Sequence, residues 1–362
     1  MPTRQRIVVC GAGVIGAAVA YFLTLRGRPP ILVERARPGA AASGRAGGFL
    51  ALDWNDTTPV GPLARASFRL HEQLAANLAT DVGYRHIETL LVAGMDDGDV
   101  GGYRRLPNPM WLDGNVAVHS IIGTAASTAQ VNPMALTQAL VHEALTGGAQ
   151  VITGVVDGLE RAPGGAVGGV SVDGQPIPAD VVVLALGPWM ARAHEWIALP
   201  PIHALKGASI TLAADVPPQA VFGHYRTRDG RHMSPEIYPR PGGEVYVNGY
   251  PERDPLPDDP DSIAPSAAAC DELHRVAGAH SSLLADAQVT SRRACYRPVT
   301  DDGIPLIGPA RSMPGVYVAA GHGAWGILNA PATGRMIAEM ILDGRSHSVD
   351  AAPFALTRLS AG

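Results

Sequence analysis

The chain has 362 residues, a net charge of −5 and 46% hydrophobic residues, which excludes a disordered or fibrous protein. No block of Lys and Arg occurs, so no nucleic-acid partner is expected, because phosphate binding needs clustered positive charge. No apolar run reaches the ~18 residues of a membrane span, and no signal peptide with a cleavage site is apparent. Three cysteines are too few for a disulfide framework. We therefore expect a cytoplasmic protein without a membrane partner.

The N-terminal segment has the pattern of a strand–helix–strand unit. Residues 6–10 (RIVVC) form a short apolar run typical of a buried parallel strand. Residues 14–26 are predicted to form a helix that ends at Gly27, and residues 31–34 (ILVE) the next strand. This arrangement is typical of a nucleotide-binding fold.

Three glycines connect the first strand to the helix in the spacing Gly11-x-Gly13-x-x-Gly16. The first allows a tight turn, the second lets the backbone approach a pyrophosphate, and the third lets helix and strand pack closely. The helix N-terminus between Gly13 and Gly16, which includes Val14 and Ile15, offers N–H groups and a positive dipole end to phosphates. Glu34 ends the second strand, where a carboxylate accepts hydrogen bonds from ribose hydroxyls. Together these features predict a dinucleotide cofactor.

A second match, Gly321-x-Gly323-x-x-Gly326, follows the apolar run 316–320. It is not followed by another strand with an acid at its end. We therefore expect one dinucleotide, with its adenine half at the N-terminal motif.

The rest of the chain divides into two kinds of pattern. Helices are predicted at 62–80, at 133–145 after the cap Asn132, and at 331–342; strands are predicted at 149–153, 169–172, 179–186, 208–212 and 244–249. The region 200–293 is rich in proline and alternates like an antiparallel sheet, and from Cys295 onward we expect a turn, a strand, a turn and the last helix.

The predicted fold class is therefore α/β, with a Rossmann-type dinucleotide-binding domain and an interrupting α+β substrate domain built on an antiparallel sheet. The first domain is assigned residues 1–81, 131–200 and 295–362, and the second residues 82–130 and 201–294.

Several segments resemble the family of D-amino-acid oxidases, glycine oxidases and sarcosine oxidases. They are VVCGAGVIGAAVAYFLTLRG, SGRAGG at 43–48, VNPMALTQALVHEALTGGAQVITG, DVVVLALGPW, CYRPVTDDGIPLIG and AAGHGAWGILNAPATG. SGRAGGFLALDW and PEIYPRPGGEVYVNG are similar to a poorly characterised oxidoreductase branch of that family. The resemblance covers nearly the whole chain in order, and it implies FAD as the cofactor.

The resemblance also implies which residues face the cofactor. Those near the AMP half are Gly11, Gly13, Gly16, Glu34 and Arg35, with Val155 (or Val156) at the adenine end. Those near the pyrophosphate and ring system are Ser43, Gly44, Arg45, Gly47 and Gly48, and those beside the dinucleotide are Gly187 and Trp189. Those that pass the pyrimidine end of the flavin are Gly321, His322, Gly323, Trp325, Gly326 and Ile327.

The resemblance implies that Arg297, in the segment CYRPVT, is the partner of a substrate carboxylate, with which a guanidinium pairs bidentately. The alternative is a structural ion pair with Asp301 or Asp302. Cys295 stands where some sarcosine oxidases attach flavin through a thioether, but its neighbours differ, so we expect a free thiol and non-covalent FAD.

Glu236 and Tyr238 lie two residues apart in a predicted strand, so their side chains share one face. That face either holds the substrate ammonium or faces solvent. His322 either polarises the flavin or is a hydrogen-bonded structural histidine. Lys206 is expected to be a solvated lysine rather than a residue that supports the flavin.

The predicted function is oxidation of the C–N bond of a small amino acid or secondary amine that carries a carboxylate. A hydride would pass to flavin N5, leaving an imine, and oxygen or another acceptor would reoxidise the cofactor. The alternatives are a flavoenzyme for a non-amine such as a 2-hydroxy acid, and a non-catalytic flavoprotein. No spacing of His, Cys or Glu predicts a metal site.

Overall fold

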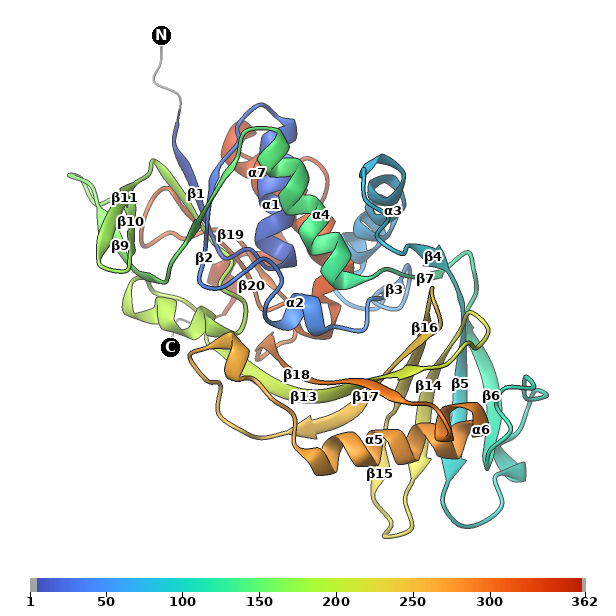
Figure 1. The fold of residues 1–362 in the computed structure, drawn as a ribbon. Helices are drawn as coiled ribbons and strands as arrows, with labels where there is room; N and C mark the ends of the chain where they lie inside the picture. Colours follow the sequence, from blue (N-terminus) through green and yellow to red (C-terminus); the bar gives the residue numbers. More distant parts are fainter. Residues whose placement is uncertain (1–4, 360–362) are drawn as a thin grey trace.

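The computed structural model describes residues 5–359. Figure 1 shows two parts, one around a parallel sheet and one around a larger curved sheet. The strand order of the first sheet is β19-β20-β12-β1-β2-β8, and that of the second is β18-β13-β17-β16-β14-β5-β6, with β15 paired to β14. This confirms the predicted α/β class with a Rossmann-type domain and a second domain.

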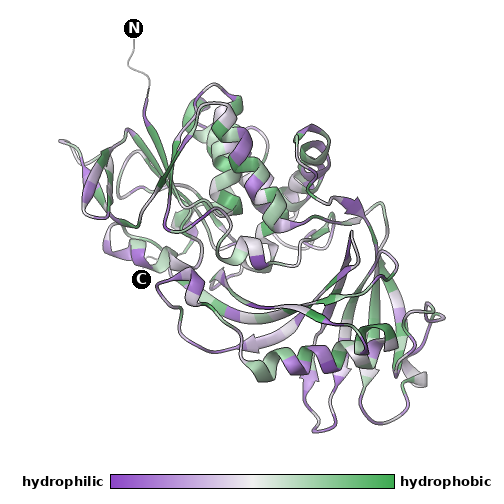
Figure 2. Ribbon diagram, in the orientation of Figure 1, coloured by the Kyte–Doolittle hydropathy of each residue, from purple (hydrophilic) through white to green (hydrophobic). Residues whose placement is uncertain are grey.

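The first sheet is parallel except at one edge. Its strands are β1 (Ile7–Cys10), β2 (Ile31–Glu34), β8 (Gln150–Thr153), β12 (Val181–Leu184), β20 (Val316–Ala320) and the antiparallel edge strand β19 (Leu306–Pro309). All four residues of β1 are buried, because both faces of the sheet are covered. Ile7 and Val9 pack toward the helices, whereas Val8 and Cys10 pack toward the small sheet β9 (Val156–Arg161), β10 (Val167–Val172) and β11 (Gln175–Pro178). Figure 2 shows the strands of the parallel sheet mainly in green, the colour of hydrophobic residues.

Helices cover one face of this sheet. They are α1 (Val14–Leu25), α4 (Pro133–Thr146) and α7 (Gly326–Asp343), and α3 (Gly61–Asn77) packs on α7. The side chain of Asn132 accepts hydrogen bonds from the N–H groups of Met134 and Ala135, as expected of a cap. The predicted start of the last helix at Pro331 is wrong: α7 begins five residues earlier and contains the proline.

The second sheet is mainly antiparallel. Its strands are β5 (Glu88–Met95), β6 (Val116–Gly123), β13 (Ile202–Ala213), β14 (Gln219–Arg226), β15 (His232–Met233), β16 (Glu236–Arg240), β17 (Glu244–Glu252) and β18 (Val289–Thr300). The expected succession of turn, strand, turn and helix begins only after Thr300, not at Cys295, because β18 runs through Cys295 and pairs with β13 as far as Thr300. The expected domain boundary at residue 295 therefore falls inside a strand.

Short elements complete the chain. They are α2 (Ala42–Arg45), α6 (Ser282–Ala285), the small sheet of β3 (Phe49–Ala51), β4 (Arg85–His86) and β7 (Thr128–Gln130), and 3₁₀ turns at Gly101–Tyr103, Gly187–Glu195, Pro260–Ser262, Gly323–Trp325, Ala352–Phe354 and Leu356–Arg358.

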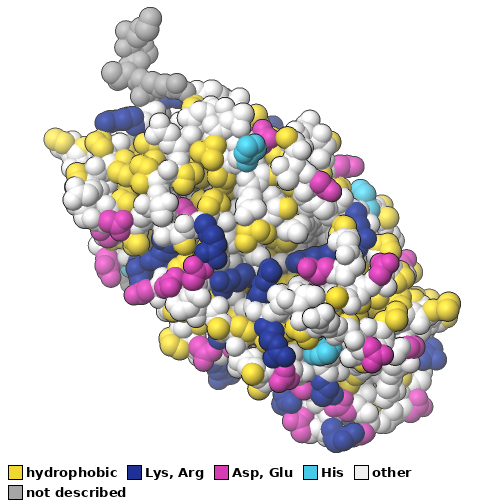
Figure 3. All heavy atoms as spheres, in the orientation of Figure 1, with side chains coloured by type: hydrophobic (Ala, Val, Ile, Leu, Met, Phe, Trp, Pro, Cys, Tyr) yellow, Lys and Arg dark blue, Asp and Glu magenta, His cyan; other side chains and the backbone are white. Residues whose placement is uncertain are grey.

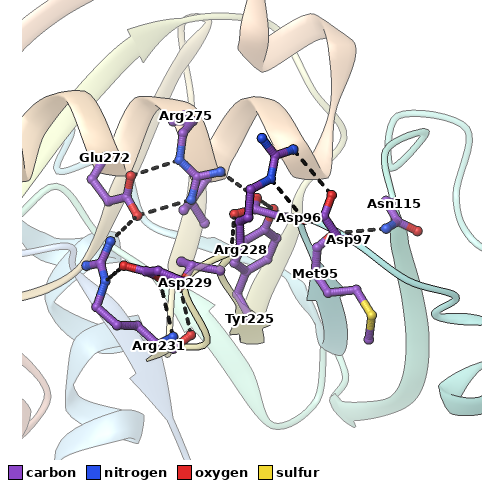
Figure 4. Close-up of polar contacts among 12 residues, drawn as sticks. Met95, Asp96, Asp97, Asn115, Tyr225, Arg228, Asp229, Arg231, Glu272 and Arg275 are labelled. Atoms are coloured by element: carbon purple, nitrogen blue, oxygen red, sulfur yellow. Dashed lines mark hydrogen bonds and ion pairs between the residues drawn. The ribbon is translucent and has the colours of Figure 1, made fainter.

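Helix α5 (Ala267–His280) covers the outer face of the second sheet. Its apolar residues, among them Leu273, pack with Ile210 and Val247 of the central strands. An ion-pair network joins Arg275 of this helix to Asp96, which follows β5 (Figure 4). The outer face is thus filled, and the opposite face is left for the cavity described below.

Candidate functional site

A cavity of about 880 Å³ is bounded by both parts of the molecule. One wall comes from the loops at the carboxyl ends of β1, β2, β12 and β20, where ligands of open α/β sheets bind. The other wall comes from the inner face of the second sheet. Figure 3 shows Lys and Arg side chains gathered across the middle of one face of the molecule.

The glycine motif forms the inner end of the first wall. Gly11 has φ +102°, and a Cβ on it would lie 2.4 Å from the Ala185 carbonyl oxygen. Gly13 lines the cavity together with Val14 and Ile15. Gly16 does not line it, because it packs against the strand side: a Cβ there would lie 1.9 Å from the Gly11 carbonyl oxygen. The glycines thus have the backbone roles expected of such a motif.

Glu34 lies at the end of β2 and lines the cavity. Its Oε2 accepts from the Ala12 N–H (2.8 Å) and its Oε1 from the Ala36 N–H (3.0 Å), so the carboxylate is held rigidly at the turn. Ser43 reaches the N-terminus of α1, where its hydroxyl accepts from the Val14 N–H at 2.9 Å. A fixed acid beside an accessible helix N-terminus fits the ribose and phosphates of a dinucleotide.

The predicted adenine end is lined by Arg35, Trp189 and the strand start at 155–156. The Arg35 guanidinium stacks on the Trp189 ring, 4.7 Å from its centroid. Burial, followed by the nearby Arg192, lowers the pKa of Arg35. The N–H of Val155 already donates to Asp173 Oδ1 (3.2 Å), and its carbonyl accepts from the Asp173 N–H (3.0 Å).

The three glycines and the arginine of the SGRAGG segment fall into two pairs. Gly47 and Gly48 line the cavity, whereas Gly44 and Arg45 do not. Gly44 packs on α4, and the Arg45 guanidinium donates to the carbonyls of Pro260 (2.9 Å), Ala294 (3.0 Å) and Ile263 (3.1 Å). A Cβ on Gly47 would lie 2.5 Å from the Tyr238 ring, so the glycine permits a close approach between the two domains.

The C-terminal loop brings its residues to the cavity with one exception. Those that line it are His322, Gly323, Trp325, Gly326 and Ile327 together with Gly187 of the β12 loop. Gly321 does not line it: it has φ +76° and faces Thr300. His322 is 5% exposed, and its Nε2 lies 3.0 Å from the Thr333 hydroxyl. Burial lowers the pKa of His322 to about 3, so the ring is neutral at ordinary pH.

The second sheet contributes Glu236 and Tyr238 from β16, and both line the cavity. The Tyr238 hydroxyl donates to Glu236 Oε2, and Asn248 Nδ2 donates to the same oxygen at 3.0 Å. Oε1 of Glu236 has no hydrogen-bond partner among residues 5–359. Burial, followed by the Glu236 charge, raises the pKa of Tyr238 well above its usual value, so the phenol stays protonated. The alternative of a solvent-facing strand is wrong, because Tyr238 is only 4% exposed.

Asn248 and Tyr246 also line the cavity and were missed from the sequence. They lie two apart on β17, directly opposite Glu236 and Tyr238 on β16. Period-two alternation indicates that they share a face, but the register that pairs them with Glu236 and Tyr238 is not visible in the sequence. Tyr246 stacks on Tyr238 with 5.9 Å between ring centroids.

Arg297 of β18 lines the cavity and has no acidic partner within the described part of the chain. The two acids considered as alternatives are occupied elsewhere. Asp301 Oδ1 lies 2.8 Å from His203 Nε2, and Asp302 pairs with Arg358 at 2.8 Å. A Cβ on Gly207 would lie 3.7 Å from an Arg297 nitrogen, so the guanidinium extends over the inner face of the sheet.

Cys295 is free and lines the cavity. Burial raises the pKa of its thiol, although Arg297 and Arg45 act in the opposite direction. Thioether formation needs a thiolate, which a raised pKa disfavours.

The expectation of a solvated Lys206 is wrong, because the residue is 7% exposed. Its ammonium pairs with Glu252 at 3.3 Å and with Asp254. A buried ammonium needs such carboxylates, and Lys206 itself does not line the cavity.

Among residues 5–359, no group of three or more His, Cys, Asp or Glu side chains is placed to hold a metal ion. No helix in this range has the length and apolar character needed to cross a membrane.

Comparison with known proteins identifies relatives over nearly the whole chain. The DAO family model, described as FAD dependent oxidoreductase, matches residues 6–340. The chain is 27% identical to glycine oxidase of Geobacillus kaustophilus over 389 residues, covering 99% of this chain and 98% of the relative. It is 29% identical over 383 residues to an oxidoreductase of Schizosaccharomyces pombe, with 97% of each chain covered. The crystal structure of the Geobacillus kaustophilus glycine oxidase superposes with a TM-score of 0.79 at 25% identity, covering 98% of this chain and 99% of that one.

Proposed function

Because the chain belongs to the DAO family of FAD dependent oxidoreductases, we propose that it oxidises the C–N bond of a small amino acid or secondary amine that carries a carboxylate. The observation that carries this proposal is the Arg297 guanidinium, which lines the cavity without an acidic partner among the described residues. Arg297 is exposed at the cavity, so its guanidinium is accessible to an anionic ligand. A substrate carboxylate is such a ligand, and it pairs with a guanidinium through two parallel hydrogen bonds.

Glu236 supplies the complementary charge. Its Oε2 is held by Tyr238 and Asn248, which leaves Oε1 for a donor on the substrate. Glu236 on β16 and Arg297 on β18 both line the cavity from the inner face of the second sheet. An acid and an arginine on one wall complement the ammonium and carboxylate of a zwitterionic amino acid. The name of the glycine oxidase relative supports such a substrate.

The first wall fits FAD through the exposed backbone at Gly13, the fixed acid Glu34 and the N-terminus of α1. When bound there, FAD supplies the acceptor for a hydride from the substrate carbon. The contribution of the chain is orientation: Arg297 and Glu236 fix two points of the substrate, which sets the direction of its Cα–H bond. The neutral His322 adds no positive charge, so backbone N–H groups of the loop 321–327 would stabilise negative charge that develops beside it.

The proposal is tested with the FAD-loaded protein under anaerobic conditions. Matched panels of carboxylate-bearing amines and of 2-hydroxy acids are mixed with it, and the visible flavin absorbance is followed. We expect at least one amine to bleach the flavin and the hydroxy acids to leave it oxidised. Bleaching by hydroxy acids alone would contradict the assignment of an amine substrate. If neither panel reduces the flavin, the assignment of a carboxylate-bearing substrate is wrong. Reaerating the reduced protein then shows whether oxygen or another acceptor restores the cofactor.

A further inference from the structure

A second cavity of about 300 Å³ lies behind one wall of the cofactor cavity. We call it the Asn329 chamber. It is lined by Asn55, Thr57, Thr58, Pro59 and Val60 before α3, by Asp302, Gly303, Ile304 and Pro305 before β19, and by His322, Trp325 and Asn329. His322 and Trp325 line both cavities, so these two residues connect the chamber to the wall of the cofactor cavity.

The chamber collects buried polar atoms that the protein leaves without partners. These atoms are Asn55 Nδ2, His322 Nδ1, and both Nδ2 and Oδ1 of Asn329. The three residues are 7%, 5% and 1% exposed. Leaving one such atom unsatisfied costs about 1–3 kcal/mol, and four around one cavity need a ligand as their explanation.

The charges around the chamber restrict what that ligand is. Asp302 is already paired with Arg358, through hydrogen bonds of 2.8 and 3.1 Å. His322 is neutral because burial lowers its pKa to about 3. No unpaired charge therefore lines the chamber among residues 5–359, which disfavours an ion. The free atoms are donors and acceptors side by side, and water satisfies both kinds.

We propose that the Asn329 chamber holds ordered water bound to Asn55, His322 and Asn329, and that this water is a proton-exchange route to the wall of the cofactor cavity. Nε2 of His322 is taken by the Thr333 hydroxyl, so Nδ1 is the ring atom left for that water. The route reaches His322 from the side of the loop 302–305. The proposal does not depend on Arg297 or Glu236, and it holds whichever substrate the protein takes.

The first test is a high-resolution crystal structure of the FAD-loaded protein without substrate. We expect waters within the ~2.7–3.2 Å of a hydrogen bond from both amide atoms of Asn329 and from His322 Nδ1. A dry chamber, or side chains turned so that protein groups satisfy these atoms, would overturn the proposal.

The second test measures exchange of the His322 ring proton with solvent, by nuclear magnetic resonance on protein labelled with ¹⁵N-histidine. Asn329→Leu keeps the approximate size of the side chain and removes both water ligands, so exchange should slow several-fold. Asn55→Leu serves as a second variant if the first does not fold. Thr57→Val is the matched control, because Thr57 lines the same chamber but is exposed, and it should exchange as the wild type does. Unchanged exchange in both leucine variants, or equal slowing in the control, would refute the route.

Discussion

Nε2 of His71 lies 3.0 Å from the carbonyl oxygen of Ile327, the carbonyl that Pro331 leaves without a partner four residues later. The same nitrogen lies 3.1 Å from the Leu328 carbonyl, and Ser67, one turn earlier on α3, accepts from the Ala332 N–H at 3.0 Å. Helix α3 thus satisfies the backbone groups around the proline. This allows α7 to begin before Pro331 and to present Gly326 and Ile327 to the cofactor cavity.

Replacing His71 by Phe should therefore weaken both the fold and FAD binding. The Ile327 carbonyl would lose its donor, and the free energy of unfolding should fall by about 1–3 kcal/mol. Urea unfolding and FAD titration of the apoprotein measure the two effects. His142→Phe, at an exposed position of α4, is the control. If His71→Phe matches that control in both assays, the carbonyls are satisfied in another way.

Glu34→Ala should weaken FAD binding with the fold retained. The carboxylate now orders the turn through the N–H groups of Ala12 and Ala36 and would also accept from the ribose. We expect a loss on the order of 1–3 kcal/mol in binding free energy, read by fluorescence titration of apoprotein with FAD. Unchanged affinity would mean that this acid does not reach the cofactor.

Stability should decline as the pH falls below about 6.5, the pKa of an unfolded histidine. Burial lowers the pKa of His71 and His280 to about 4 and that of His322 to about 3. Between the pKa of the folded state and that of the unfolded state, the unfolded chain binds a proton that the folded chain does not. Each histidine therefore lowers the free energy of unfolding by ~1.4 kcal/mol for each unit by which the pH falls in this range. The stabilising contribution of the neutral, buried histidines is fully present above pH ~6.5.

Urea unfolding at about pH 7.5, 6 and 5 measures this slope. His280 lies in the second domain and does not line the cofactor cavity, so His280→Phe should make the slope shallower without changing FAD binding. Asp229, with a pKa of about 2, affects stability only at lower pH. A flat profile down to pH ~5 would show that these rings are hydrated or already charged in the folded protein.

Gly47→Ala should disturb the substrate end more than the cofactor end. The added Cβ would lie 2.5 Å from the Tyr238 ring, so the ring must shift and weaken its hydrogen bond to Glu236. We expect slower flavin reduction by the best amine at saturating concentration. Gly158→Ala, where the Cβ would meet only Ser171 at 3.5 Å, is the control. Equal rates in the two variants would mean that Tyr238 adapts at no cost.

Local patterns predicted the nucleotide-binding half well. The strands 31–34 and 316–320 have the predicted bounds, and the cap at Asn132 is present. These features depend on neighbours in the sequence: an apolar run, a glycine spacing, or an asparagine before a proline.

The errors all involve partners far apart in the sequence. The early start of α7 depends on His71, some 256 residues away. The length of β18 depends on pairing with β13, and the burial of Lys206 depends on Glu252 and Asp254. Asn248 joins the site only through the register of β16 with β17. None of these relationships has a local signal, because the periodicity of one strand does not specify its partner.

The central claim is that Arg297 pairs with a substrate carboxylate, and anaerobic flavin reduction tests it most directly. Arg297→Lys and Arg297→Ala are compared with the wild type, using the best carboxylate-bearing amine and its carboxylate-free analogue. Lysine keeps the charge but lacks the planar fork, and alanine removes both. We predict that FAD still binds to both variants, that the wild type strongly prefers the carboxylate-bearing amine, and that Arg297→Ala loses most of this preference, with Arg297→Lys intermediate. The same ratio of rates in the wild type and Arg297→Ala, or loss of FAD from the variant, would contradict the assignment.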